Sequence, residues 1–545
     1  MCGNNILPVK VIKCDGNISN QEVLLKEKVM QISVAQSYEE FATISGKTYI
    51  IFDFGKEISG GVRVITYNAD GEKKVRLRFG ESVSETCAEI GEDNATNDHS
   101  LRDFTVELQS YSDMTFGNTG FRFLRTDTEE NCTIKLYALT AVSDIDERQQ
   151  IGKFSCDDKL INEIWDTAAY TLRLCIHNGY FWDGIKRDRL VWIGDLNCEM
   201  NSAYCLYGDM PEIRNCLDFA EKEGSKIEWI NGIPMFSLWW LIDLYEDYLH
   251  TGETDYAKNK LPFINKILSD TEKCVDIDGN TFFPYNFIDW TSHYMDGESN
   301  AKREDELIGV NFLTQIAVNA AKLLLTALCE DYSLCDEMLR RLKRKHSAVN
   351  EFKQAAALSV LAGDTSESAL KVLLSDIYEG QSSFFMYYTL SAMAKVGKYS
   401  DALNVMRKYY GGMLSLGATS FWEDFDIGFG EKCRRIDEWQ QSEETDFHRK
   451  FGIHCYKGFR HSLCHGWSSG VIPYIVRNIV GIRFIGAGQE EFEIDAHLCG
   501  LKEVKSVYPT KYGNIEIEYK VIDGNLEKTI NYPSELKLKD IKIEL

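Results

Sequence analysis

The spacing of apolar residues changes twice along the chain, and this change restricts the folds that the sequence can adopt. Near the N-terminus apolar and polar residues alternate, as in 75–79 (VRLRF), which is typical of a strand with one face in water. In 160–172 the apolar residues instead fall on one stripe of a helix, for which Asp157 or Ser155 is the expected cap. Alternation returns in 515–521. The sequence therefore predicts a β region, a long helical region and a second β region.

Short loops join about a dozen helical stretches in the middle of the chain. Short connections make consecutive helices antiparallel, and this number of helical hairpins is typical of an (α/α)6 barrel. An α-solenoid is the structural alternative, but the sequence has no repeat of fixed period. After 160–172, helices are predicted at 196–207, 212–223, 235–250, 255–275, 307–329, 333–346, 349–361, 366–379, 384–397, 400–410 and 467–480.

We expect a multidomain chain whose parts pack tightly, because no Pro- or Ser-rich linker separates them. The N-terminal domain, 1–148, is predicted to be an antiparallel β-sandwich. An all-α (α/α)6 barrel spans 149–484, and a small C-terminal β-sandwich spans 485–545. The N-terminal strands are predicted at 49–54, 61–67, 75–79, 104–108, 121–125 and 132–139.

Composition excludes several classes of protein. The formal net charge of −24 argues against nucleic-acid binding and against an anionic membrane surface. No apolar run approaches the ~18 residues of a membrane span. The first residues lack the apolar segment of a signal peptide, so we interpret the 16 cysteines as reduced thiols of a cytoplasmic protein. The sequence is compatible with a homodimer.

Neither a cofactor nor a metal is expected. The sequence has no Walker A motif and no dinucleotide-binding GxGxxG after a strand. His461 and His465 have helical i,i+4 spacing, but no HExxH motif surrounds them.

Acidic residues and tryptophans cluster in a few loops of the helical region. The loop 180–200 (YFWDGIKRDRLVWIGDLNCEM) contains three Asp residues among arginines and tryptophans. The structural alternative is a salt-bridged loop that leads into a helix. The functional interpretation is a sugar site, with carboxylates, an Arg on the hydroxyls and a Trp platform. Further clusters contain Trp422 and Glu423, His465 and Trp467, Trp239 and Trp240, and Asp289 and Trp290.

Two carboxyl groups that flank an anomeric carbon can hydrolyse a glycosidic bond. One donates a proton to the leaving oxygen, and the other activates water or attacks directly. The acids of 183–195 and Glu423 come from opposite halves of the predicted barrel, where they could face each other across a central pocket.

These motifs resemble the bacterial α-L-rhamnosidases of glycoside hydrolase family 78. The resemblance rests on FDFGKEISGGVRV, RLRFGESVSE, TGFRFLR, WDGIKRDRLVWIGDL, FIDW, GATSFWEDFD and SLCHGWSSG, in the family's order. It implies a fold of β-sandwiches around an (α/α)6 barrel. It also implies exo-hydrolysis of terminal α-L-rhamnose with inversion.

The resemblance assigns roles to individual residues. Asp188 takes the place of the general acid, where many members have Glu, and Glu423 that of the general base. Asp183, Arg187 and Asp195 correspond to residues that bind sugar hydroxyls, and His465 to a residue that contacts the sugar. The predicted binding site further includes Trp192, Trp239, Trp240, Asp289, Trp290 and Trp422.

The surroundings of Asp188 in the sequence leave two alternatives to a rhamnosidase open. Arg187 and Arg189 would lower its pKa, whereas Asp183 and Asp195 would raise it. The chain is therefore a rhamnosidase, a related (α/α)6 glycosidase for another sugar, or a sugar-binding homologue that has lost catalysis. Its partner is expected to be a small carbohydrate or rhamnosylated glycoside, because the chain is shorter than many family members.

Overall fold

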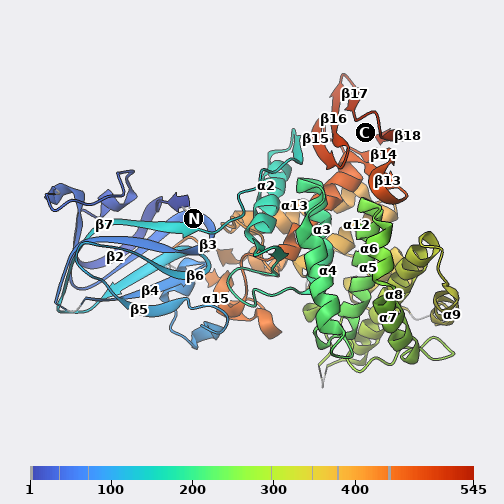
Figure 1. Cartoon of the computed structure of the whole chain (residues 1–545), viewed down its shortest axis with the longest axis horizontal. Helices are drawn as coiled ribbons and strands as arrows, with labels where there is room; N and C mark the ends of the chain where they lie inside the picture. Colours follow the sequence, from blue (N-terminus) through green and yellow to red (C-terminus); the bar gives the residue numbers. More distant parts are fainter. Residues whose placement is uncertain are drawn as a thin grey trace.

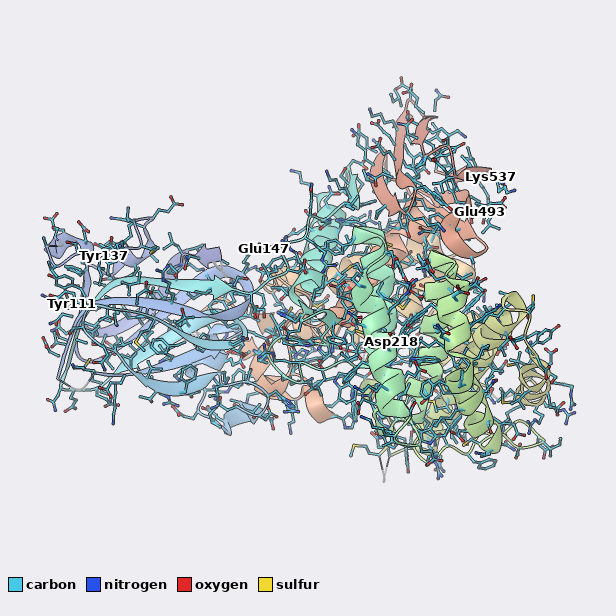
Figure 2. The ribbon with its side chains drawn as sticks, in the orientation of Figure 1. Tyr111, Tyr137, Glu147, Asp218, Glu493 and Lys537 are labelled. Carbon is cyan, nitrogen blue, oxygen red and sulfur yellow. The ribbon has the colours of Figure 1, made fainter. Side chains whose placement is uncertain are left out.

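A sheet domain, a helical domain and a second, smaller sheet region follow one another along the chain in the computed structural model (Figure 1). The structure describes residues 4–545 except 36, 72, 296–297, 346–347, 377, 379 and 440–443. The predicted order of β, α and β regions is confirmed. Figure 2 shows Glu147 at the junction of the first two parts, whereas Tyr111 and Tyr137 lie at the far end of the sheet domain.

The N-terminal strands form one seven-stranded sheet rather than two separate sheets. β7 pairs with the first residues of β3 through Ile134 and Ile44, and with the last ones through Ile134 and Ala69. The sheet therefore folds over on itself around an apolar core. Its strands are β1 (Asn4–Ile6), β2 (Lys10–Ser19), β3 (Ala42–Gly71), β4 (Lys74–Gly80), β5 (Asp103–Glu107), β6 (Ser112–Thr128) and β7 (Cys132–Ser143).

The strands predicted at 49–54 and 61–67 are two parts of the long strand β3. Gly55 and Gly60 lie between them with φ of 83° and 146°, and the pairing register shifts at this point. Glycine adopts such angles without steric penalty, so these residues bend the strand at bulges instead of ending it.

Most predicted helices are present with shifted ends, whereas the stretch predicted at 467–480 consists of a 3-10 turn (Gly466–Gly470), α16 (Val471–Tyr474) and a π-helical turn (Ile475–Val480). The helix expected at 255–275 is divided in two, because Pro262 lies in the first turn of the second helix. The helices are α2 (Lys159–Leu174), α3 (Ile193–Tyr207), α4 (Pro211–Gly224), α5 (Pro234–Thr251), α6 (Thr254–Asn259), α7 (Leu261–Lys273), α8 (Asn300–Ala327), α9 (Ser333–Leu342), α10 (Lys353–Ala362), α11 (Glu367–Leu373), α12 (Ser383–Lys395), α13 (Tyr399–Ser415) and α16 (Val471–Tyr474), with short α1 (Val83–Cys87), α14 (Ile427–Gly430) and α15 (Phe447–Lys450).

Neighbouring helices pack in sequence: α3 on α5, α5 on α8, α8 on α10 and α10 on α12. α12 in turn contacts α3 and α16. Among the described helices, α8 alone is long and apolar enough to cross a membrane by length and composition. However, 67% of its most apolar window is buried inside the protein, as expected of a core helix.

The C-terminal sheets take a strand from outside the predicted domain. β8 (Lys153–Cys156) pairs with β15, so the chain enters the helical domain through this sheet. The first C-terminal strand begins at Ile482, three residues before the predicted boundary. One sheet contains β13 (Ile482–Ile485), β14 (Glu491–His497) and β18 (Lys537–Glu544), and the other contains β8, β15 (Glu503–Thr510), β16 (Gly513–Ile522) and β17 (Asn525–Asn531).

A buried ammonium group joins the sheet domain to the helical domain. Lys186 Nζ lies 2.8 Å from Glu81 Oε2 and 3.3 Å from Glu85 Oε1. It also donates to the carbonyl oxygens of Phe459 and His461, at 2.9 and 2.6 Å. Because the ammonium has several acceptors, its burial is compensated, and the loop that contains it is fixed to both domains.

We expect Lys186→Met to lower the free energy of unfolding by about 3–5 kcal/mol, because it leaves buried carboxylates without a counter-charge. Urea denaturation measures this change. The control Lys226→Met removes an exposed pair with Glu223 and should change stability by less than about 1 kcal/mol. Equal effects of the two substitutions would contradict the role of Lys186.

Candidate active site

Three loops that are far apart in the sequence meet in the helical domain. Gly466 N donates to the carbonyl oxygen of Asp183 at 2.6 Å, and Glu423 N donates to that of Ser462 at 3.0 Å. The Trp467 indole N–H donates to the carbonyl of Glu423 at 3.1 Å. Backbone bonds thus bring the sequence clusters around 183, 423 and 465 into one place.

These loops enclose a cavity of about 220 Å³. Every residue of the predicted site except Trp239, Trp240 and Trp422 lines it. Sequence reasoning missed several lining side chains, because isolated aromatic and aliphatic residues on helices look like core. The cavity is lined by Asp183, Arg187, Asp188, Trp192, Gly194, Asp195, Ile233, Phe236, Phe287, Asp289, Trp290, Phe384, Glu423, Arg460, His465 and Trp467.

Three predicted tryptophans belong to the protein core instead. The Trp240 indole N–H donates to the carbonyl of Leu217, and its ring meets Phe263 edge-on. Trp422 is fully buried against Phe425 and Phe447. Trp239 packs behind Phe384, which itself lines the cavity. The prediction that these rings wall the sugar site is wrong for all three, because a neighbouring aromatic ring or the helix core covers each one.

Arg187 connects the two proposed catalytic carboxylates. Its Nη1 donates to Asp188 Oδ2 at 2.9 Å, and its Nη2 donates to Glu423 Oε1. Its Nε donates to the carbonyl of Arg460 at 2.9 Å, which fixes the plane of the guanidinium. Burial raises the pKa of Glu423, and the adjacent guanidinium opposes this rise.

The backbone at Asp188 has an unusual conformation. Asp188 and Arg189 have φ of 53° and 58°, in the left-handed region that side chains other than glycine rarely adopt. Arg189 points away from Asp188: its guanidinium donates to Asn118 and lies 4.6 Å over the Trp182 ring. Of the two arginines that flank Asp188 in sequence, only Arg187 therefore bonds its carboxylate.

His465 and Asp195 form a buried pair on another wall of the cavity. His465 Nε2 lies 3.1 Å from Asp195 Oδ2, and its Nδ1 lies 3.9 Å from Glu423 Oε1. Burial, assisted by Arg187, lowers the pKa of His465 well below its usual value, so the imidazole is neutral. Burial, followed by the nearby Glu199, raises the pKa of Asp195.

Asp289 presents one free carboxylate oxygen. Its Oδ2 accepts from Ser382 Oγ at 2.6 Å and from Thr291 Oγ1 at 2.8 Å. Its Oδ1 is buried and has no hydrogen-bond partner among the residues that the structure describes. Burial raises the pKa of Asp289 to about 6. Because a buried polar atom is costly without a partner, Oδ1 is suited to bind a ligand hydroxyl.

Aromatic rings form another part of the cavity lining. Trp192 meets Phe236 edge-on at 5.8 Å, and Phe384 stacks on Trp467 at 5.1 Å. Gly194 is required here, because a Cβ at this position would lie 2.7 Å from the Phe236 ring. A cavity lined by both carboxylates and aromatic rings suits a pyranose, which has hydroxyl groups and a flat apolar face.

The described residues contain one group whose geometry could hold a metal ion, Glu81, Glu85 and His448. It lies outside the cavity. Lys186 Nζ lies within 3.3 Å of Glu85 and 2.8 Å of Glu81, so a cation already occupies this place.

A helical domain whose loops gather carboxylates and indole rings around a small cavity is the kind of domain found in glycosidases. Residues 149–327 match the family model of the bacterial alpha-L-rhamnosidase six-hairpin glycosidase domain. No curated protein matches the chain.

Solved structures of rhamnosidases have the same fold. The family 78 rhamnosidase of Bacillus sp. GL1 superposes with a TM-score of 0.71 at 19% identity, over 92% of this chain and 53% of that one. The rhamnosidase of Klebsiella oxytoca with rhamnose bound gives a TM-score of 0.66 at 16% identity, over 87% of this chain and 95% of that one. The rhamnosidase of Streptomyces avermitilis complexed with L-rhamnose gives a TM-score of 0.68 at 15% identity, over 90% of this chain and 48% of that one. The chain thus spans about half of the Bacillus and Streptomyces proteins.

The positions of the tryptophans predict different effects on stability. Trp240→Ala should lower the free energy of unfolding by about 3–5 kcal/mol, because it empties a fully buried site. Trp290→Ala should cost less, because its half-buried ring faces the cavity. Urea denaturation of both variants tests this, and a larger loss for Trp290→Ala would contradict the assignment.

Proposed function

We propose that this protein is an inverting exo-α-L-rhamnosidase. The observation that carries the proposal is the cavity in which Arg187 bonds both Asp188 and Glu423. Two carboxylates at one cavity are the pair that glycoside hydrolysis requires, and inverting enzymes hold this pair ~6.5–9.5 Å apart. The rhamnose bound in the Klebsiella and Streptomyces relatives supports the choice of sugar.

In this mechanism Asp188 protonates the glycosidic oxygen as the bond to the anomeric carbon breaks. Glu423 takes a proton from the water that attacks this carbon on the opposite face. Arg187 favours the ionised form of Glu423, which the role of base requires. Asp289 Oδ1 and the His465–Asp195 pair are placed to bind sugar hydroxyls.

The proposal includes an (α/α)6 barrel. The packing order α3, α5, α8, α10, α12 and back to α3 beside α16 supports an inner ring of helices. A cavity of about 220 Å³ at one end of this ring suits one sugar ring, which supports exo action on small glycosides. The 14 described free cysteines agree with the proposed cytoplasmic location, where thiols stay reduced.

Release of L-rhamnose from an aryl α-L-rhamnoside tests the proposed activity, and proton NMR of the first product tests inversion, which gives the β-anomer. Glu423→Gln should lower kcat by about 10²–10⁴-fold with little change in unfolding. The control Glu438→Gln changes an exposed carboxylate and should keep full activity. A panel of other aryl glycosides decides between rhamnose and another sugar. An inactive parent that Asp188→Glu activates would instead support a homologue that has lost catalysis.

Arg187 should set the acidic limb of the pH profile. Burial raises the pKa of Glu423 and Arg187 lowers it, so Arg187→Met should raise this pKa further. The acidic limb of kcat/KM, which reports the base in the free enzyme, should then move to higher pH. The control Arg340→Met removes an exposed guanidinium that pairs with Glu337 on α9 and should leave the limb in place. A limb that stays fixed in Arg187→Met would contradict the role of Arg187.

A further inference from the structure

A histidine from the N-terminal sheet domain contacts the proposed general acid. His99 precedes β5, and its Nε2 lies 3.2 Å from Asp188 Oδ1. The His99 side chain is 31% exposed, so it also reaches solvent. No motif of the sequence indicates this contact, and the catalytic steps described above do not use it.

Neighbouring contacts hold the segment around His99 against the catalytic loop. Ser100 Oγ donates to the carbonyl of Lys186 at 2.7 Å. On the other side of His99, the Asp98 carboxylate accepts from Arg460 Nη1. The segment is therefore bonded to two different loops of the helical domain, and the position of His99 is fixed by both.

The charged groups that face His99 are Asp98 on its own segment, Asp188 and Arg187 on the catalytic loop, and Arg460. Asp98 Oδ2 lies 3.4 Å from His99 Nε2, and Arg460 Nη2 lies 3.9 Å from Asp188 Oδ1. Asp188 therefore has three charged or titratable neighbours, Arg187, Arg460 and His99. An arginine keeps its proton at any ordinary pH, whereas histidine exchanges one near neutrality.

A carboxyl group that protonates a leaving group must regain a proton in every turnover. We propose that His99 supplies this proton and thereby works through Asp188 as a proton relay between solvent and the cavity. The inference rests on the proposed role of Asp188 as general acid. It makes the N-terminal sheet domain a part of the hydrolytic site.

The relay starts from an imidazolium at His99 and a carboxylate at Asp188. The proton on Nε2 moves to Asp188 Oδ1, which leaves a neutral imidazole and a carboxylic acid. The acid O–H then rotates and protonates the glycosidic oxygen as the bond to the anomeric carbon breaks. Water adds to that carbon, and its proton passes to Glu423. His99 takes up one proton from solvent and Glu423 releases one, so the cycle balances.

His99→Gln tests the relay, because glutamine keeps an N–H donor but does not titrate. Two substrates are compared: a phenyl α-L-rhamnoside, whose leaving group needs protonation, and a 2,4-dinitrophenyl α-L-rhamnoside, whose leaving group does not. At pH 7 we expect kcat/KM to fall ~10-fold or more for the phenyl compound and to change little for the dinitrophenyl compound. The alkaline limb of the phenyl profile should also move to lower pH.

Glu107→Gln is the matched control, because it changes an exposed side chain of the same domain, on β5, and leaves the contacts of His99 and Asp188 intact. The ratio of kcat/KM for the two substrates should be the same in this variant as in the parent. Thermal unfolding checks that both variants fold. A parent-like ratio in His99→Gln, or an equal loss on both substrates, would overturn the relay while the parent's activity keeps the proposed function. If the parent hydrolyses neither compound, the proposed function fails and the relay fails with it.

Discussion

The ammonium group of Lys186 is the interaction on which the rest of the structure depends most. It lies between two carboxylates of the sheet domain and two carbonyls of the helical domain. A charge in this environment is tolerated only while all its partners are present. The two domains therefore cannot shift relative to each other without exposing or stranding a buried charge, and the loop that carries Lys186 is held in one position.

The next residue along the same loop, Arg187, points into the cavity and bonds both proposed catalytic carboxylates. Lys186 and Arg187 bond different partners, so one dipeptide fixes the domain interface with its first residue and the carboxylates with its second. The positive φ values at Asp188 and Arg189 follow immediately. Strain of this kind persists only where the surroundings hold the backbone firmly, and Lys186 and Asn118 supply that hold.

Much of the fold could be predicted, because the period of the apolar residues depends only on local geometry. The clusters around 183, 423 and 465 could also be found, because their residue types are rarely placed together for packing alone. The tryptophans show what the sequence pattern does not decide. Trp239 and Trp240 are neighbours on one helix, and the pattern does not tell which face meets the cavity. His99 carries no local signal at all, since its contact with Asp188 exists only once two domains pack together.

The carboxyl groups around the cavity lie near one another, but they differ in burial and in their charged neighbours. Burial raises the pKa of Asp183, Asp195 and Asp289, so these groups hold less charge than their number suggests and suit a neutral, hydroxyl-rich ligand. Glu423 is equally buried, but a guanidinium opposes the effect of burial there. Asp188 is the most exposed of the five, and a histidine from the sheet domain lies beside it. Environment, rather than residue type, thus distinguishes the proposed base, the proposed acid and the proposed binding groups within one pocket.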